Sequence, residues 1–228
     1  MRVEKEALMR FHLTYTGPLK STQPAHYSNV DGVFTDKRGG QKHAIRRDFH
    51  RQLKQLWATN EFLNTARMLR GGAPAHDARP GDSGARWGHD PNELVSIVEA
   101  ISGKYHQDGY RFVPLVRAEW SLACSLRILF LRRDAPGSLY SAGDVDNRVK
   151  TAIDALSKPD SRVDDRPAEG EDPFFVLLEN DKLVTHLEVE TDRLLDPPSP
   201  TDDLAQVRLV ISVEIRAHNV TMFNLGFS

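Results

Sequence analysis

Two long runs of alternating apolar and polar residues constrain the fold of this chain more than any other feature. One run spans residues 120–132 and the other spans residues 207–215. An apolar residue at every second position is typical of a β-strand that buries one face and exposes the other. The apolar positions are Leu122, Cys124, Leu126, Ile128 and Phe130 in the first run, and Val207, Leu209, Ile211, Val213 and Ile215 in the second. The chain is therefore expected to contain a β-sheet that is covered on one side.

The remaining patterns predict further strands and helices around this sheet. Additional strands are expected at residues 10–16, 110–116, 174–178 and 182–190, the last two joined by a tight turn at 179–181. Helices are expected at residues 41–60, 91–101 and 145–156. This order predicts an α/β (α+β) fold, in which a mixed β-sheet has helices packed on it.

Length and composition indicate one globular domain. With 228 residues, of which 39 % are hydrophobic, the chain is expected to form a single domain over residues 1–228, with loop insertions at about 71–90 and 158–173. The single cysteine, Cys124, excludes an intrachain disulfide and favours a cytoplasmic location. No segment has the ~20 apolar residues of a membrane span, so no membrane partner is expected.

A polar ridge runs along the helix predicted at 145–156. Asp144 and Asp146 lie where a loop should enter this helix, and on extended backbone residues two apart point the same way. Lys150 follows Asp146 by one helical turn, and Asp154 follows Lys150 by another. Converging carboxylates suit Mg²⁺ or Mn²⁺, which serve phosphoryl chemistry. The alternative is a solvated helix cap, because Asp and Asn are favoured at helix starts.

The stretch D-V-D-N-x-x-K-x-x-x-D-A-L, over residues 144–156, resembles the signature of the RusA-type Holliday-junction resolvases. Asp181, which precedes a predicted strand, resembles an acidic position that follows this signature in the same family. The resemblance implies that Asp144, Asp146 and Asp181 are metal ligands and that Lys150 is the essential lysine, acting near the scissile phosphate.

The resemblance also implies an activity and its partners. The chain would be a structure-selective endodeoxyribonuclease that depends on Mg²⁺, or on Mn²⁺ in its place. It would work as a homodimer on Holliday junctions or related branched DNA. Two other functions stay open. The chain could be a non-catalytic DNA-binding or regulatory protein with the same fold, or an interaction protein that docks through the acidic loop at residues 158–173.

The helix predicted at 41–60 carries a basic side opposite its apolar stripe. Because the formal net charge of the chain is −2, a nucleic-acid partner has to be argued from such local charge. A clustered basic face is typical of a surface that contacts phosphates, and the alternative is an ordinary solvated helix face. The residues predicted to contact DNA are Lys42, Arg46, Arg47, Arg51 and Lys54.

Overall fold

A computed structural model provides the structure of the protein. It describes residues 7–20, 37–69, 94–107, 109–133, 142–159, 168–197, 205–219, 221 and 224. The insertion predicted at 71–90 lies outside these ranges, and the one predicted at 158–173 lies partly outside them.

The main sheet is mixed, as predicted. Its strands are β1 (Met9–Pro18), β9 (Gln206–Ala217), β6 (Leu122–Arg132) and β8 (Val184–Arg193), in that spatial order. β9 is antiparallel to both of its neighbours, whereas β6 and β8 are parallel. Together with the helices, this sheet confirms the predicted α+β fold.

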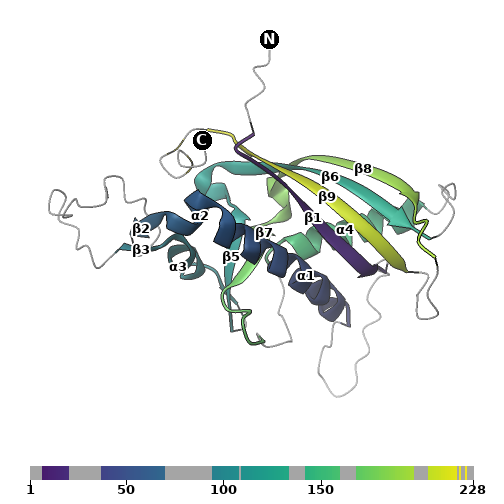
Figure 1. Ribbon diagram of the computed structural model, residues 1–228, viewed down its shortest axis with the longest axis horizontal. Helices are drawn as coiled ribbons and strands as arrows, with labels where there is room; N and C mark the ends of the chain where they lie inside the picture. Colours follow the sequence, from purple (N-terminus) through teal and green to yellow (C-terminus); the bar gives the residue numbers. More distant parts are fainter. Residues whose placement is uncertain are drawn as a thin grey trace, which may run out of the picture.

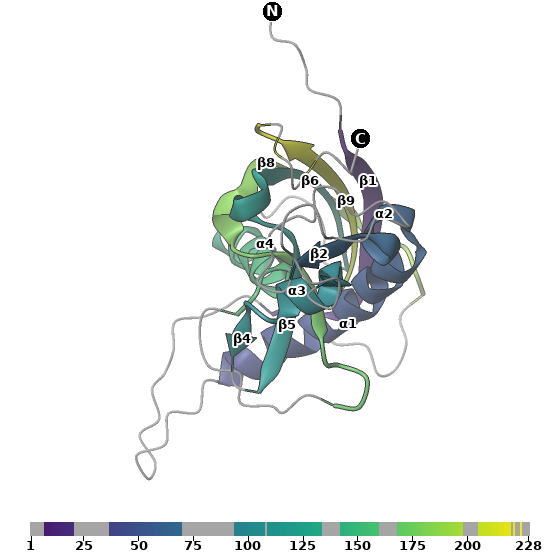
Figure 2. The same cartoon turned by 90° about the vertical axis from the view of Figure 1, so that its left-hand side faces the viewer.

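Two long helices cover one side of the main sheet. They are α1 (Lys37–Thr59) and α4 (Ala142–Leu156), and Figure 1 shows both beneath the strands. A smaller sheet contains β4 (His106–Gln107), β5 (Tyr110–Val116) and β7 (Phe174–Leu178). Because α1 contacts both β1 and β7, it is packed between the two sheets (Figures 1 and 2).

The alternating runs fold as their patterns predict. All ten alternating apolar positions named for the two runs are buried on the side of the main sheet that faces the helices, and one hydrophobic core includes them all. Burial raises the pKa of the Cys124 thiol to about 12, so this cysteine is an inert core residue. Within the described ranges, no helix combines the length and apolar character needed to cross a membrane.

The helix predicted at 91–101 begins later than expected. The smaller elements here are α2 (Glu61–Thr65), β2 (Arg67–Leu69), β3 (Leu94–Ser96) and α3 (Ile97–Ser102). β3 pairs with β2, so residues 94–96 are a strand. The hydroxyl of Ser96 accepts a hydrogen bond from the N–H of Glu99 at 3.1 Å and caps α3. A pairing partner distant in the sequence decided the conformation of residues 94–96.

The tight turn predicted at 179–181 does not join two paired strands. β7 is parallel to β5 in the small sheet, whereas β8 is parallel to β6 in the main sheet. The chain crosses between the sheets through a short 3-10 turn, Asp181–Leu183. The two strands are joined by a short turn, as predicted, but they belong to different sheets, and this determines where Asp181 lies.

Candidate functional site

The predicted polar ridge lies on the solvent side of α4. Asp146 and Lys150, one helical turn apart, are exposed, whereas Val149, Ala152 and Leu156 are buried against the core. The helix is held by its apolar side and presents an acid and a cation to solvent. For Asp146 and Lys150, the prediction that the ridge faces away from the core is confirmed.

The start of α4 differs from the prediction in a way that affects the aspartates. The helix begins at Ala142, so Asp144 and Asp146 both lie on helical backbone. Residues two positions apart on a helix do not face each other, so the expected alignment on extended backbone is wrong. The Asp144 side chain lies outside the described part of the structure. Both residues remain in the N-terminal part of the helix, where the helix dipole favours negative charge.

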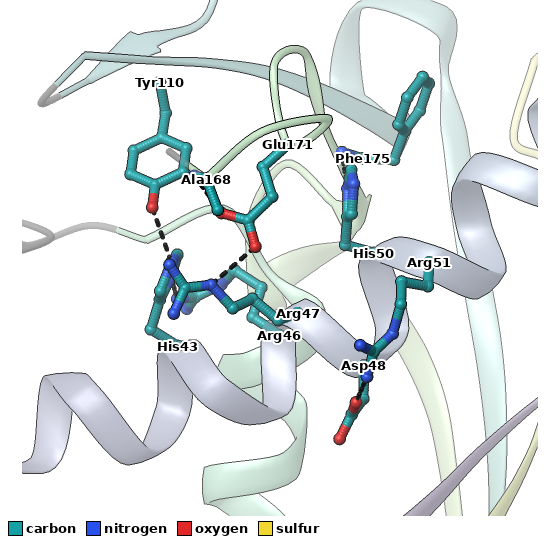
Figure 3. A network of polar contacts seen from close by, with 10 residues as sticks. All are labelled: His43, Arg46, Arg47, Asp48, His50, Arg51, Tyr110, Ala168, Glu171 and Phe175. Carbon is teal, nitrogen blue, oxygen red and sulfur yellow. Dashed lines mark hydrogen bonds and ion pairs between the residues drawn. The ribbon is translucent and has the colours of Figure 1, made fainter. Parts of the chain in front are cut away.

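Two of the residues predicted to contact DNA form ion pairs on the surface. The Nζ of Lys42 lies 2.5 Å from Oδ2 of Asp154 and joins α1 to α4. Arg51 forms an ion pair with Asp48, one turn earlier on α1 (Figure 3). The last acid of the polar ridge therefore contacts a neighbouring helix, and we assign it a structural role.

Asp181 and Asp146 lie toward opposite ends of α4. β6 and β8 are parallel neighbours with α4 in their connection, so α4 runs back antiparallel to them. The backbone that follows α4 pairs with the end of β7. Asp181 comes three residues before Val184, which pairs with Cys124 near the start of β6. Ten residues of α4, about 15 Å of helix, separate Asp146 from Leu156, so this topology places Asp146 toward the N-terminal end of α4 and Asp181 toward its C-terminal end.

The described residues contain no group of three or more His, Cys, Asp and Glu side chains that could hold a metal ion. A metal ion bound near α4 would therefore have few protein ligands among the described residues. Mg²⁺ commonly takes one or two protein carboxylates and fills its other positions with water and phosphate oxygens. The exposed carboxylate of Asp146 fits that pattern, whereas the described residues offer no complete protein cage.

Arg46, which was predicted to contact DNA, is buried instead. It is 4 % exposed, and on the same side of α1 His43 and His50 are 2 % and 3 % exposed. Its Nε donates to the carbonyl of Ser157 at 3.0 Å, and its Nη2 donates to the carbonyl of Asp154 at 3.0 Å. These acceptors are carbonyls at the C-terminus of α4, where a cation is favourable. The prediction for Arg46 is wrong because α1 is covered on two sides.

Two further basic residues of α1, Arg47 and Lys54, hold the chain that leads into β7. The Nε of Arg47 lies 2.7 Å from Oε1 of Glu171, and Figure 3 shows Glu171 above this face of α1. The Nζ of Lys54 donates to the carbonyl of Gly170 at 2.7 Å. Arg47 and Lys54 therefore remain near the surface, but acceptors from this chain already occupy them.

His50 is a buried neutral base that the sequence interpretation missed. The N–H of Phe175 donates to its Nδ1 at 2.8 Å, which requires an unprotonated nitrogen, and its ring stacks on Phe174 with centroids 4.3 Å apart. Burial lowers the pKa of His50, and the nearby cation of Lys54 lowers it further. The charge of Glu171 offsets part of this effect. The neutral ring thus helps to fix the start of β7 against α1.

His43 forms a second buried contact between α1 and the small sheet. Its Nε2 lies 2.9 Å from the hydroxyl of Tyr110, and its Nδ1 lies 3.4 Å from Nη1 of Arg46 (Figure 3). Because the arginine can only donate, we assign the ring proton to Nε2. The signal that predicts this burial is a second helical stripe beside the apolar one, formed by His43, Arg46, His50, Leu53 and Trp57.

Comparisons with known proteins assign no family to this chain. No family model, curated protein or solved structure matches it. The relation to RusA-type resolvases therefore remains a prediction from the motif at residues 144–156. The geometry adds the solvent exposure of Asp146 and Lys150 and the position of Asp181 at the opposite end of α4.

Proposed function

We propose that this chain is a Mg²⁺-dependent endonuclease that acts on branched DNA. The observation that carries the proposal is the exposed pair of Asp146 and Lys150, one turn apart near the N-terminus of α4. Asp144 lies two residues earlier on the same helix. An acid and a cation side by side on an open surface can meet a phosphate of a large substrate, which needs no deep pocket.

Each residue has a distinct role in this proposal. When bound, the metal ion polarises the scissile phosphate and activates water. Asp146, whose carboxylate is exposed, is a proposed ligand, and Asp144 is proposed to act from the same helix N-terminus, where the partial positive charge favours both carboxylates. Lys150 places its ammonium group where negative charge develops on the phosphate in the transition state. The contacts of Arg46 and Lys42 with α4 hold this helix in a fixed position on α1.

Asp181 is left out of the proposed ligand set. It lies before β8, at the edge of the β6–β8 pair opposite the start of α4. Two carboxylates with water and a substrate phosphate are sufficient for Mg²⁺ or Mn²⁺. A homodimer, implied by the resemblance, would present two such helices to the two strands of a junction.

One observation favours a second candidate, a non-catalytic DNA-binding protein on the same fold. It is the absence, among the described residues, of any three-acid group that could hold a metal. Such a protein would bind branched DNA through basic residues and would need no metal ion. A direct test of metal binding separates the two candidates.

Asp146→Asn tests the proposed activity. Because Asp146 is exposed, the variant should fold as the wild type does and still bind a four-way DNA junction. Its cleavage of that junction with Mg²⁺ should fall at least a hundredfold, in the range seen when one electrostatic contact to a transition state is removed, about 10²–10³. Calorimetric titration with Mn²⁺ should show binding to the wild type and weaker binding to the variant.

Asp181→Asn is the matched control. It removes the same charge at the opposite end of α4, so its cleavage rate should stay close to that of the wild type. Full cleavage by Asp146→Asn would refute the proposed site. The non-catalytic candidate would be favoured if the wild type binds the junction but neither cleaves it nor binds Mn²⁺ in the calorimetric titration.

A further inference from the structure

Three basic side chains from two elements converge on three consecutive residues. We call residues 170–172 the acidic strap, because they carry Glu171 and Asp172 and cross α1 just before β7. The contacts are Lys54 Nζ to the carbonyl of Gly170 at 2.7 Å, Arg47 Nε to Oε1 of Glu171 at 2.7 Å, and Arg111 Nε to Oδ1 of Asp172 at 3.0 Å. One short segment thus supplies an oxygen acceptor to each cation.

The strap is held in a defined conformation. Gly170 has a φ of +81°, in the region that favours glycine. Burial alone would raise the pKa of Glu171, but the N–H of Ala168 and the guanidinium of Arg47 outweigh it and hold this pKa below its usual value. Glu171 is therefore ionised at neutral pH, with both of its oxygens engaged.

Carboxylate contacts of this kind use the same chemistry as phosphate contacts. Arginine and lysine donate charge-assisted hydrogen bonds to carboxylates and to phosphates alike. Arg111 and Asp172 are 41 % and 43 % exposed, and an exposed ion pair contributes little to stability, so another anion can replace Asp172 readily. Arg47 and Lys54 lie on the same side of α1, two helical turns apart.

We propose that Arg47, Lys54 and Arg111 form a phosphate-binding surface for nucleic acid, which the acidic strap occupies until the substrate displaces it. The proposal rests on the proposed function for the identity of its partner, DNA. It revises the predicted contact surface by removing Arg46 and adding Arg111. It also gives a role to acidic residues in the 158–173 insertion, which compete with DNA for the same cations.

The competing explanation is that the strap is only a turn that positions β7. A purely structural strap predicts that neutralising Glu171 lowers stability and leaves DNA binding unchanged. A competing strap predicts tighter DNA binding, because Arg47 becomes available to a phosphate. The two explanations therefore predict different changes in affinity from one substitution.

The experiment measures binding of a fluorescent four-way DNA junction in EDTA, so that no cleavage occurs. Glu171→Gln should bind about fivefold to tenfold more tightly at 0.1 M salt, with a salt slope steeper by about 0.9, as expected for one additional phosphate contact. Glu190→Gln, an exposed glutamate on β8, makes the same change in net charge and should leave affinity within twofold of the wild type. Circular dichroism of each variant checks that the fold is retained.

A second substitution tests whether the gain in DNA affinity depends on Arg47. In an Arg47→Gln background, Glu171→Gln should give no gain, because the cation it releases is absent. If Glu171→Gln fails to fold, Asp172→Asn with and without Arg111→Gln provides the same comparison on the more exposed pair. Support for the proposal requires a gain that disappears with the matching arginine.

The outcomes separate this inference from the proposed nuclease. Equal affinities for Glu171→Gln and Glu190→Gln would overturn the strap even if the wild type cleaves junctions. A gain specific to Glu171→Gln would support the strap even if no variant cleaves DNA. No binding of junction DNA by the wild type or by Glu171→Gln would overturn the inference outright.

Discussion

His50 should make the stability of this protein fall in mild acid. The ring is 3 % exposed, accepts a hydrogen bond from the N–H of Phe175, and stacks on Phe174. Protonation would remove the acceptor and place a second cation near Lys54. Burial, followed by the charge of Lys54, lowers the pKa of His50 from its ordinary value of 6.5.

The sign and size of the effect follow from proton linkage. The unfolded chain binds a proton at His50 near pH 6.5, whereas the folded chain resists protonation. The contribution of the neutral ring is therefore complete above pH 6.5 and is lost as the pH falls below that value. The loss has a limiting slope of about 1.4 kcal/mol per pH unit, so it amounts to at most about 1.4 kcal/mol between pH 7.5 and pH 5.5.

His50→Asn isolates this contribution, because an asparagine oxygen can accept from the N–H of Phe175 without titrating. At pH 7.5 the variant should lose about 1–3 kcal/mol of unfolding free energy through lost packing and hydrogen bonding. Urea unfolding at several pH values should then show a smaller fall toward pH 5.5 in the variant than in the wild type. His12→Asn, on an exposed position of β1, is the control and should keep the wild-type slope. Identical pH dependence in the wild type and His50→Asn would refute the role of the buried ring.

Three further substitutions test the packing around α1 and the main sheet by urea unfolding. Arg46→Met should lower the unfolding free energy by about 2–4 kcal/mol, because two carbonyls of α4 lose a charged donor, whereas Arg51→Met on the exposed side should change it little. Equal effects at these two positions would contradict the burial of Arg46. Gly170→Ala should cost about 1–2 kcal/mol, because a φ of +81° is strained for alanine, and an unchanged stability would show that the strap adapts. Phe130→Ala should cost about 3–5 kcal/mol in the core, against a small change for Leu195→Ala at an 84 % exposed position, and a cost below 1 kcal/mol would place Phe130 outside the core.

The sequence alone determined the long strands and helices and the apolar residues of their buried sides. Alternation over residues 120–132 and 207–215 requires extended backbone, because only a period of two puts those apolar side chains on one side. The helical spacing in α1 and α4 identified their main buried stripes for the same reason. The exposed ridge of Asp146 and Lys150 could also be predicted, because the apolar residues of α4 fix which side faces the core.

Only the tertiary structure decided how these elements meet. The helical spacing of His43, Arg46 and His50 signals a second buried side of α1, but nothing in the local pattern identifies the sheet that covers it. The placement of Asp181 likewise depends on the parallel pairing of β6 with β8, which reverses the direction of α4 between them. Periodicity records which side of an element is buried. The choice of a pairing partner depends on contacts between residues far apart in the chain, so it had to come from the folded structure.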